Sequence, residues 1–164
     1  MLSRRNVAIS ALGFIFSGLS ARKGQAAQSG PQTFEVVKSE AQWQRDLTPQ
    51  QFDVLRKHGT ERPRSSPLDK TYTEGEYRCA GCGQPLFSSA TKFNSGTGWP
   101  SFYEPLENAI GSSTDFKLVY PRTEIHCRRC GGHLGHVFDD GPAPTGKRYC
   151  MNGVALTFVP APAR

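Results

Sequence analysis

Short apolar segments separated by clusters of glycine, proline, asparagine and serine dominate the chain beyond residue 70. Segments of this kind, bounded by turn-forming residues, are typical of β-strands. Asn152-Gly153 predicts a hairpin turn between the last two of them. The pattern predicts strands over residues 75–79, 84–87, 115–120, 124–127, 133–138, 148–151 and 154–159.

Two capping patterns predict short helices before these strands. Thr48-Pro49-Gln50-Gln51 combines a capping box with proline at the first helical position, and Gly59 closes the apolar pattern that follows. Ser39 and Gln42 repeat the capping pattern as a weaker signal. Residues 62–70 predict a loop. We therefore expect an all-β or α+β domain.

The first 26 residues have the pattern of an export signal. Arg4 and Arg5 precede an apolar stretch over residues 8–21, which is too short for a stable transmembrane anchor. Small residues favour cleavage after Ala26, and the adjacent arginines suggest the twin-arginine route to the periplasm. The alternative is a mitochondrial presequence, because the segment is rich in arginine and free of acidic residues.

The length and charge of the chain limit the domain organisation and the partners that the sequence allows. The 164 residues suit one domain over 38–160, preceded by a flexible leader at 27–37 and followed by a tail at 161–164. The net charge is +6, but four of these charges lie in the first 26 residues, which leaves +2 for the rest. A nearly neutral body argues against a nucleic-acid partner. Residues 27–164 hold no stretch apolar and long enough to predict stable membrane association, and nothing in the sequence suggests an obligate dimer.

Four of the five cysteines form two CxxC motifs, Cys79/Cys82 and Cys127/Cys130. Two pairs of thiolates on two loops can complete the tetrahedral S4 shell that suits Zn²⁺. Such a closed shell has no open position, so we expect one structural zinc ion that joins two distant hairpins. The alternatives are two disulfides or two redox-active CxxC pairs, which an oxidising compartment would favour.

Cys150 is the remaining cysteine. A single cysteine is often a buried small hydrophobic residue, but activation of a thiol requires nearby positive charge or hydrogen-bond donors. Arg148, two positions earlier, would share a strand face with Cys150. Arg148 could equally be a solvated surface charge.

His133 and His136 are candidates for acid–base chemistry, because the thiolates already fill the metal site. Residues three apart on a strand face opposite sides unless a bulge intervenes, and Gly135 could supply one. Trp99 stands in a glycine-rich loop, either as a lid over the core or as part of a site.

Together these residues resemble the methionine sulfoxide reductase B family, from about Glu35 to Pro160. Several collinear motifs carry the resemblance: Ser66-Pro67-Leu68, Lys92-Phe93-Asn94-Ser95-Gly96, Gly98-Trp99-Pro100-Ser101-Phe102, Gly132-His133-Leu134-Gly135-His136-Val137-Phe138 and Arg148-Tyr149-Cys150-Met151-Asn152.

The resemblance implies a mainly β fold of two antiparallel sheets, with short N-terminal helices and zinc held by the two CxxC pairs. It implies that the enzyme reduces methionine-R-sulfoxide in oxidised proteins. Cys150 would attack the sulfoxide sulfur and become a sulfenic acid, and His133 and His136 would bind and protonate the leaving oxygen. Trp99 would cradle the substrate methyl group. Arg148 and Asn152 would tune and position the nucleophile.

One position departs from many members of that family. Thr97 stands where they carry a second, resolving cysteine in the loop before the tryptophan. With all five cysteines assigned, we expect an external thiol, thioredoxin-like or small, to reduce the Cys150 sulfenic acid.

Two other functions remain open at this point. A zinc-stabilised binding module would use Arg128-Arg129 in the second knuckle, but it leaves Cys150 and the two histidines unexplained. A disulfide reductase or isomerase would use the CxxC pairs directly and would need them free of metal.

Overall fold

The computed structural model describes residues 33–162, so the predicted export signal and most of the predicted leader lie outside the described residues. Two short helices come first, α1 (Glu40–Asp46) and α2 (Pro49–Lys57). Both predicted capping boxes are present, at Ser39 and at Thr48. None of the described helices is long and apolar enough to cross a membrane.

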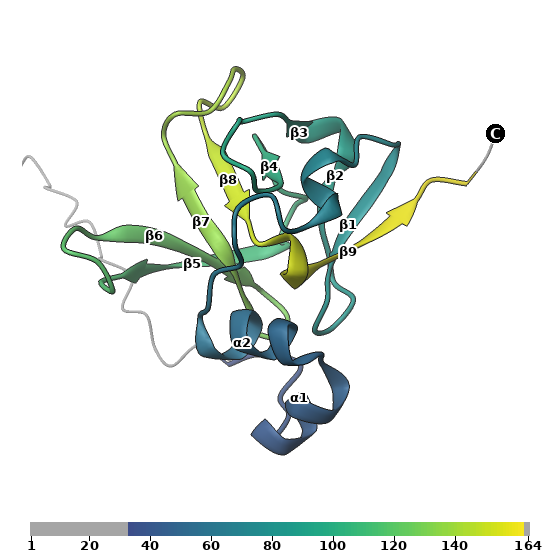
Figure 1. Cartoon of the computed structure of the whole chain (residues 1–164), viewed down its shortest axis with the longest axis vertical. Helices are drawn as coiled ribbons and strands as arrows, with labels where there is room; N and C mark the ends of the chain where they lie inside the picture. The colour runs from purple at the N-terminus through teal and green to yellow at the C-terminus, as the bar shows by residue number, and fades with distance from the viewer. Residues whose placement is uncertain (1–32, 163–164) are drawn as a thin grey trace, which may run out of the picture. The chain divides into compact units, whose positions relative to one another are not determined.

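Nine strands form two antiparallel sheets in the described part of the chain, which confirms the mainly β fold (Figure 1). The three-stranded sheet has the order β2 (Pro85–Ser88), β1 (Gly75–Cys79), β9 (Leu156–Pro160). The six-stranded sheet has the order β3 (Lys92–Phe93), β4 (Ser101–Phe102), β8 (Arg148–Met151), β7 (His133–Phe138), β6 (Arg122–Cys127), β5 (Ile110–Asp115).

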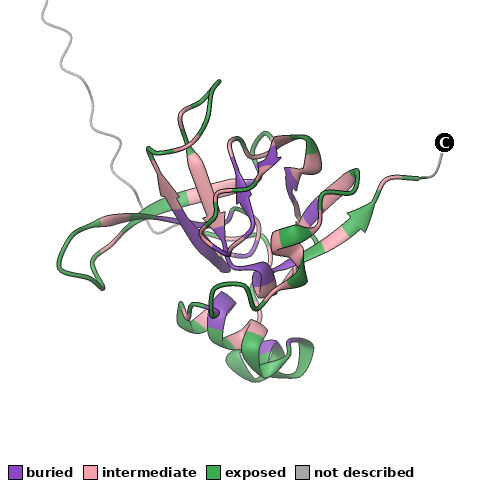
Figure 2. Ribbon diagram, turned by 45° about the horizontal axis from the view of Figure 1, so that its top comes forward, coloured by how far each residue is buried: buried purple, intermediate pink, exposed green. Residues whose placement is uncertain are grey.

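The core lies where the two sheets meet. The Phe102 ring of β4 stacks on Phe87 of β2, with 4.4 Å between ring centroids, and meets the edge of Tyr77 of β1 at 4.9 Å. All three side chains are fully buried. Figure 2 shows buried segments where the sheets approach each other, whereas the outer surfaces of the helices are exposed. Aromatic packing thus fixes the orientation of one sheet against the other.

Three sequence-based predictions were wrong in detail. The strand predicted at 115–120 is a bend, because strand β5 ends at Asp115. The carboxylate of Asp115 then accepts a hydrogen bond from the Lys117 amide. Residues 67–70 form a short 3₁₀ turn inside the predicted loop. Helix α2 ends with His58 in the left-handed conformation at φ 56°, one residue before the expected Gly59.

Asn152-Gly153 is not a hairpin turn. Strand β8 belongs to the six-stranded sheet and β9 to the three-stranded sheet, with a 3₁₀ turn at Gly153–Ala155 between them. The buried carboxylate of Glu61 accepts hydrogen bonds from the amides of Gly153 and Val154, at 2.6 and 2.9 Å. These bonds satisfy two backbone amides at the point where the chain crosses from one sheet to the other.

The expected bulge in the histidine strand is present. Ile125 on β6 pairs with Gly135, but the next residue, His126, pairs with His133. The extra residue, Leu134, reverses the alternation of side chains. His133 and His136 therefore lie on the same side of the sheet, with 5.4 Å between their ring centroids.

Candidate active site and metal centre

The two CxxC knuckles come from different sheets. Cys79 ends β1 and Cys127 ends β6, and each is followed by the same turn. The amide of Gly83 donates to the Cys79 carbonyl, and that of Gly131 donates to the Cys127 carbonyl. Both glycines have positive φ, 73° and 68°, a conformation that side chains disfavour. The two local sequences thus build matching knuckles, as the sequence predicted.

The four sulfur atoms fit a tetrahedral metal site. They lie within 4.8 Å of one another, with 3.7 Å between the sulfurs of Cys79 and Cys130 and 3.5 Å between those of Cys82 and Cys127. Zn–S bonds of about 2.3 Å place tetrahedral sulfurs about 3.8 Å apart. A disulfide needs about 2.05 Å, so none of the five cysteines is disulfide-bonded. The donor set is that of a structural zinc site between the two sheets.

Cys150 does not belong to the knuckles and lines a separate cavity of about 300 Å³. Its half-buried side chain lines this cavity. The lining residues are Thr60, Thr97, Trp99, Arg122, Gly135, His136, Phe138, Arg148, Cys150 and Asn152. Five of the six residues predicted for the active site therefore meet there, and His133 is the exception.

A row of polar side chains crosses the six-stranded sheet at this point. Cys150 on β8 pairs directly with His136 on β7 and with Ser101 on β4. His136 in turn pairs with Glu124 on β6. Directly paired residues on antiparallel strands project to the same face. The sheet register therefore brings the thiol and the histidine to one face.

Both histidines of the His133–His136 motif have a carboxylate partner. His136 Nε2 lies 2.7 Å from Asp115 Oδ2, and Arg122 Nη2 donates to the same oxygen at 2.6 Å. The Lys117 amide, His136 and Arg122 together lower the pKa of Asp115 well below its ordinary value. Burial is the main cause that lowers the pKa of His136, although the Asp115 bond opposes it. His136 is therefore a neutral ring at neutral pH, with its Nε2 proton facing Asp115.

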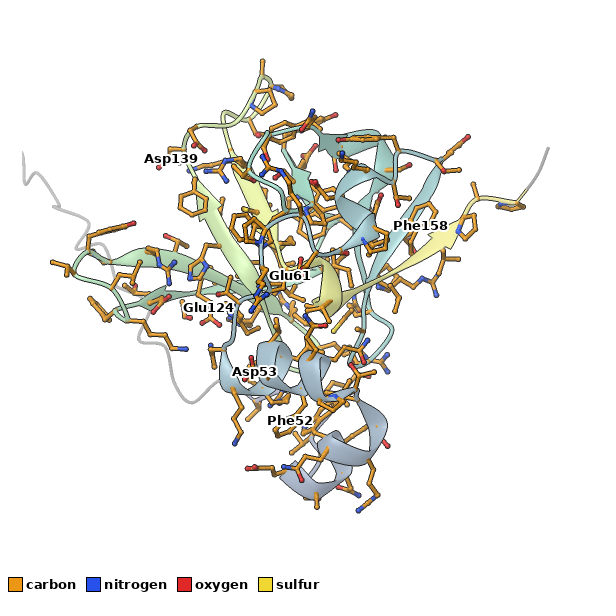
Figure 3. All side chains as sticks on the ribbon, in the orientation of Figure 1. Phe52, Asp53, Glu61, Glu124, Asp139 and Phe158 are labelled. Atoms are coloured by element: carbon orange, nitrogen blue, oxygen red, sulfur yellow. The ribbon has the colours of Figure 1, made fainter. Side chains whose placement is uncertain are left out.

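His133 lies behind His136, away from the cavity lining. Its Nδ1 donates to Glu124 Oε1 at 2.7 Å, and His58 Nδ1 reaches the same oxygen at 2.9 Å. Figure 3 shows Glu124 among the side chains where the strands meet the end of helix α2. Burial raises the pKa of Glu124, but the hydrogen bonds from His133 and Ser113 and the charge of His58 outweigh burial and lower the pKa to about 2. Glu124 is therefore ionised and holds His133 in place.

The surroundings of Cys150 are less activating than expected. Burial raises the pKa of the Cys150 thiol above its ordinary value, and hydrogen bonds from Thr97 and Ser101 and the charge of Arg148 offset this only in part. Arg148 does share the face of Cys150, but its guanidinium makes two bonds of 2.8 Å to Asp140. The free protein thus holds Cys150 mainly as a thiol.

The backbone of Glu61 binds two of the residues that line the cavity, Asn152 and Trp99. Its amide donates to Asn152 Oδ1 at 3.0 Å, and its carbonyl accepts from the Trp99 indole at 3.2 Å. Asn152 Nδ2 also donates to the Leu134 carbonyl. Asn152 and Trp99, both predicted site residues, are therefore held in fixed orientations.

The sequence reasoning missed several residues of this network. Arg122 and Glu124 alternate on β6, but the strand predicted from the sequence began at residue 124, so Arg122 lay outside it. Two charged residues two positions apart at the start of an apolar segment were the available signal. Asp115 and His58 carried no such signal, because their partners are distant in sequence. Ser95 links the hydroxyls of Thr97 and Ser101 at 2.8 Å each, and Thr97 Oγ1 lies 3.9 Å from the Cys150 sulfur.

Comparisons with known proteins identify the family. The SelR domain family matches residues 47–160. The peptide methionine sulfoxide reductase MsrB of Agrobacterium fabrum is 53% identical over 127 residues, 77% of this chain and 94% of the relative. The protein of the same name from Methanosarcina barkeri is 56% identical over 124 residues, 75% of this chain and 87% of the relative. The chain belongs to the methionine sulfoxide reductase B family.

Proposed function

We propose that the protein is a peptide-methionine (R)-S-oxide reductase in which Cys150 takes the oxygen from the sulfoxide. The pairing of Cys150 with His136 beside one cavity is the observation that carries the proposal. A cavity of about 300 Å³ accommodates a methionine side chain, and Trp99 and Phe138 line it with apolar surface.

In the proposed first step the Cys150 sulfur attacks the sulfoxide sulfur and an S–S bond forms, while a proton reaches the oxygen and the S–O bond breaks to release hydroxide. Hydroxide then attacks the Cys150 sulfur, and the S–S bond breaks. The products are methionine and a Cys150 sulfenic acid, so the thiol and the sulfoxide together supply every atom. A thiol with a raised pKa suits this balance, because its own proton can be passed to the oxygen. His136 is the proposed carrier, since its Nε2 proton faces Asp115 and its Nδ1 can accept.

The remaining residues have supporting roles in this proposal. Trp99 packs against the substrate methyl group, and Asn152 fixes the strand end that carries Cys150. The Arg148 charge and the Thr97 and Ser101 hydroxyls stabilise negative charge on the Cys150 sulfur. His133, held by Glu124, supports the ring of His136 and does not touch substrate.

An external thiol completes the cycle. Thr97 Oγ1 lies 3.9 Å from the Cys150 sulfur, and a threonine cannot form a disulfide. Two external thiol groups, on a thioredoxin-like protein or a small thiol, would reduce the sulfenic acid to Cys150 and release water. Detection of an internal disulfide that includes Cys150 after one turnover would contradict this route.

Zn²⁺ bound by Cys79, Cys82, Cys127 and Cys130 has a structural role in this proposal. Bound zinc supplies a fixed cross-link between the two sheets. The binding-module alternative is weaker, because Arg129 is paired with Glu35 and this reading gives no role to the pairing of Cys150 with His136.

We also propose export of the protein through the segment 1–26. Fractionation of a bacterial host expressing the whole chain, compared with an Arg4→Lys/Arg5→Lys variant, tests this. Equal amounts of wild type and variant in the periplasm would contradict twin-arginine export.

The decisive experiment is turnover of a peptide with separated methionine sulfoxide epimers, with dithiothreitol as reductant, by wild type and Cys150→Ser. We expect the wild type to consume the R epimer alone and Cys150→Ser to consume neither while it retains zinc. A folded, zinc-loaded wild type that consumes neither epimer would refute the proposed function.

A further inference from the structure

The loop between strands β5 and β6 exposes apolar side chains to an unusual degree. Seven large hydrophobic residues are exposed in the described part of the chain, and four of them lie within five positions of this loop. We call residues 116–121 the tip loop. Its exposed side chains are Phe116 at 76%, Leu118 at 47%, Val119 at 106% and Tyr120 at 61%.

The one charged side chain of the tip loop is bound to the body of the protein. Lys117 Nζ donates to the His58 carbonyl at 2.9 Å, and its amide donates to Asp115 Oδ1 at 2.8 Å. The usual arrangement in a surface loop is the reverse, with the charge in water and the apolar groups covered. Contiguous exposed apolar surface of this kind marks interaction sites. Figure 2 shows the loop as an exposed projection from the sheet.

The base of the tip loop borders the active-site cavity through Arg122, the residue that follows the loop. Asp115 and Arg122 close the loop at its base through a bond of 2.6 Å. Arg122 lines the cavity, and Asp115 holds His136, which also lines it. Because the residues at both ends of the loop are part of the cavity wall or bind it, the chain that flanks a bound methionine sulfoxide can extend toward the loop.

We propose that the tip loop binds the apolar residues that flank methionine sulfoxide in an unfolded segment of an oxidised protein. The inference rests on the proposed function and adds the surface that binds the chain beside the sulfoxide. Methionine is an apolar residue of protein interiors, so the chain around it is rich in apolar side chains and becomes available when that protein unfolds. Phe116 and Val119 supply matching surface beside the cavity, which free methionine sulfoxide is too small to reach.

Three substrates test the inference with the full protein. They are a Met-R-sulfoxide peptide flanked by valine, leucine and phenylalanine, the same peptide flanked by serine and glycine, and N-acetylmethionine-R-sulfoxide. The test variant is Phe116→Ser/Val119→Ser. The matched control is Val37→Ser, which changes an exposed valine outside the tip loop. The side chain of Val37 is 79% exposed.

We expect wild type to prefer the apolar peptide, and the double variant to raise KM for that peptide about tenfold with kcat unchanged. The other two substrates and the Val37→Ser control should show no change. An equal loss on all three substrates, or a preference for the apolar peptide that survives in the double variant, would overturn the inference.

Binding without turnover separates this inference from the proposed function. Fluorescence anisotropy of the labelled apolar peptide can be measured with Cys150→Ser and with Cys150→Ser carrying the tip-loop substitutions. Tighter binding to the first protein supports docking even if the wild type reduces no sulfoxide. Equal binding of the peptide by the two proteins would overturn the inference. If, in addition, only the protein with the intact tip loop sediments with phosphatidylglycerol vesicles, the loop binds a lipid surface instead.

Discussion

His136 lies directly opposite Cys150 on the neighbouring antiparallel strand, and both side chains border the same cavity. The bulge at Leu134, in the pairing of β7 with β6, places His133 on the same side of the sheet as His136. The two histidines of one short motif thus occupy unequal positions, one beside the proposed nucleophile and one against Glu124.

This inequality predicts different effects of replacing the two histidines. His136→Asn should lower kcat about 10²- to 10³-fold, the range of a lost proton carrier. His133→Asn should lower kcat only about tenfold, because it acts through the position of the neighbouring ring. Steady-state kinetics on the R-sulfoxide peptide measures both, and a larger loss in His133→Asn would reverse the assignment.

The raised pKa of Cys150 predicts slow alkylation near neutral pH in the absence of substrate. Only the thiolate reacts, so the rate with iodoacetamide should continue to rise at pH values above the ordinary thiol pKa. Arg148→Ala removes a charge that favours the thiolate, so its profile should shift to still higher pH. Cys150→Ser gives the background from the knuckle cysteines. A rate that levels off below pH 7 would contradict a raised pKa.

Removal of the metal should destabilise the whole domain, because the four thiolates join the two sheets. We expect Cys82→Ser, or exhaustive chelation, to lower Tm by about 10 °C or more, since the energy of a structural zinc site contributes directly to folding. Calorimetry with metal analysis measures this. Cys150→Ser is the control and should keep both its zinc and its Tm.

Gly135 allows strands β7 and β8 to approach each other beside Cys150. A Cβ at this position would lie 2.1 Å from the Cys150 carbonyl oxygen and 3.0 Å from Met151 Cα. Gly135→Ala should therefore cost about 3 kcal/mol of unfolding free energy and most of the activity. Gly81→Ala is the control, because its new methyl group would meet neighbours at an ordinary 3.6 Å. Urea unfolding and turnover compare the two variants.

Glu61 is expected to stabilise the crossing between the sheets. Glu61→Gln keeps one acceptor and turns an amide N–H₂ toward the Gly153 or Val154 amide, which should cost about 1 to 3 kcal/mol. Because the crossing holds Asn152, kcat should fall as well. Urea unfolding and steady-state kinetics test this, and a variant with wild-type stability would show that the two hydrogen bonds contribute little.

The sequence by itself determined the features that depend on neighbouring residues. Both capping boxes, both knuckles and the strands over 133–138 and 148–151 follow local rules, and the structure contains them. The spare cysteine beside a histidine motif was likewise visible, because composition and spacing require no tertiary contact.

Only the tertiary structure decided which distant groups meet. Asn152 gains its partner Glu61 from a position 91 residues away, and this contact replaces the expected hairpin with a crossing between sheets. Asp115 becomes the partner of His136 because the sheet register places the end of β5 beside β7 across β6. Burial outweighs the Arg148 charge at Cys150 for the same reason: desolvation depends on everything packed around the thiol, and a local sequence pattern contains no information about it.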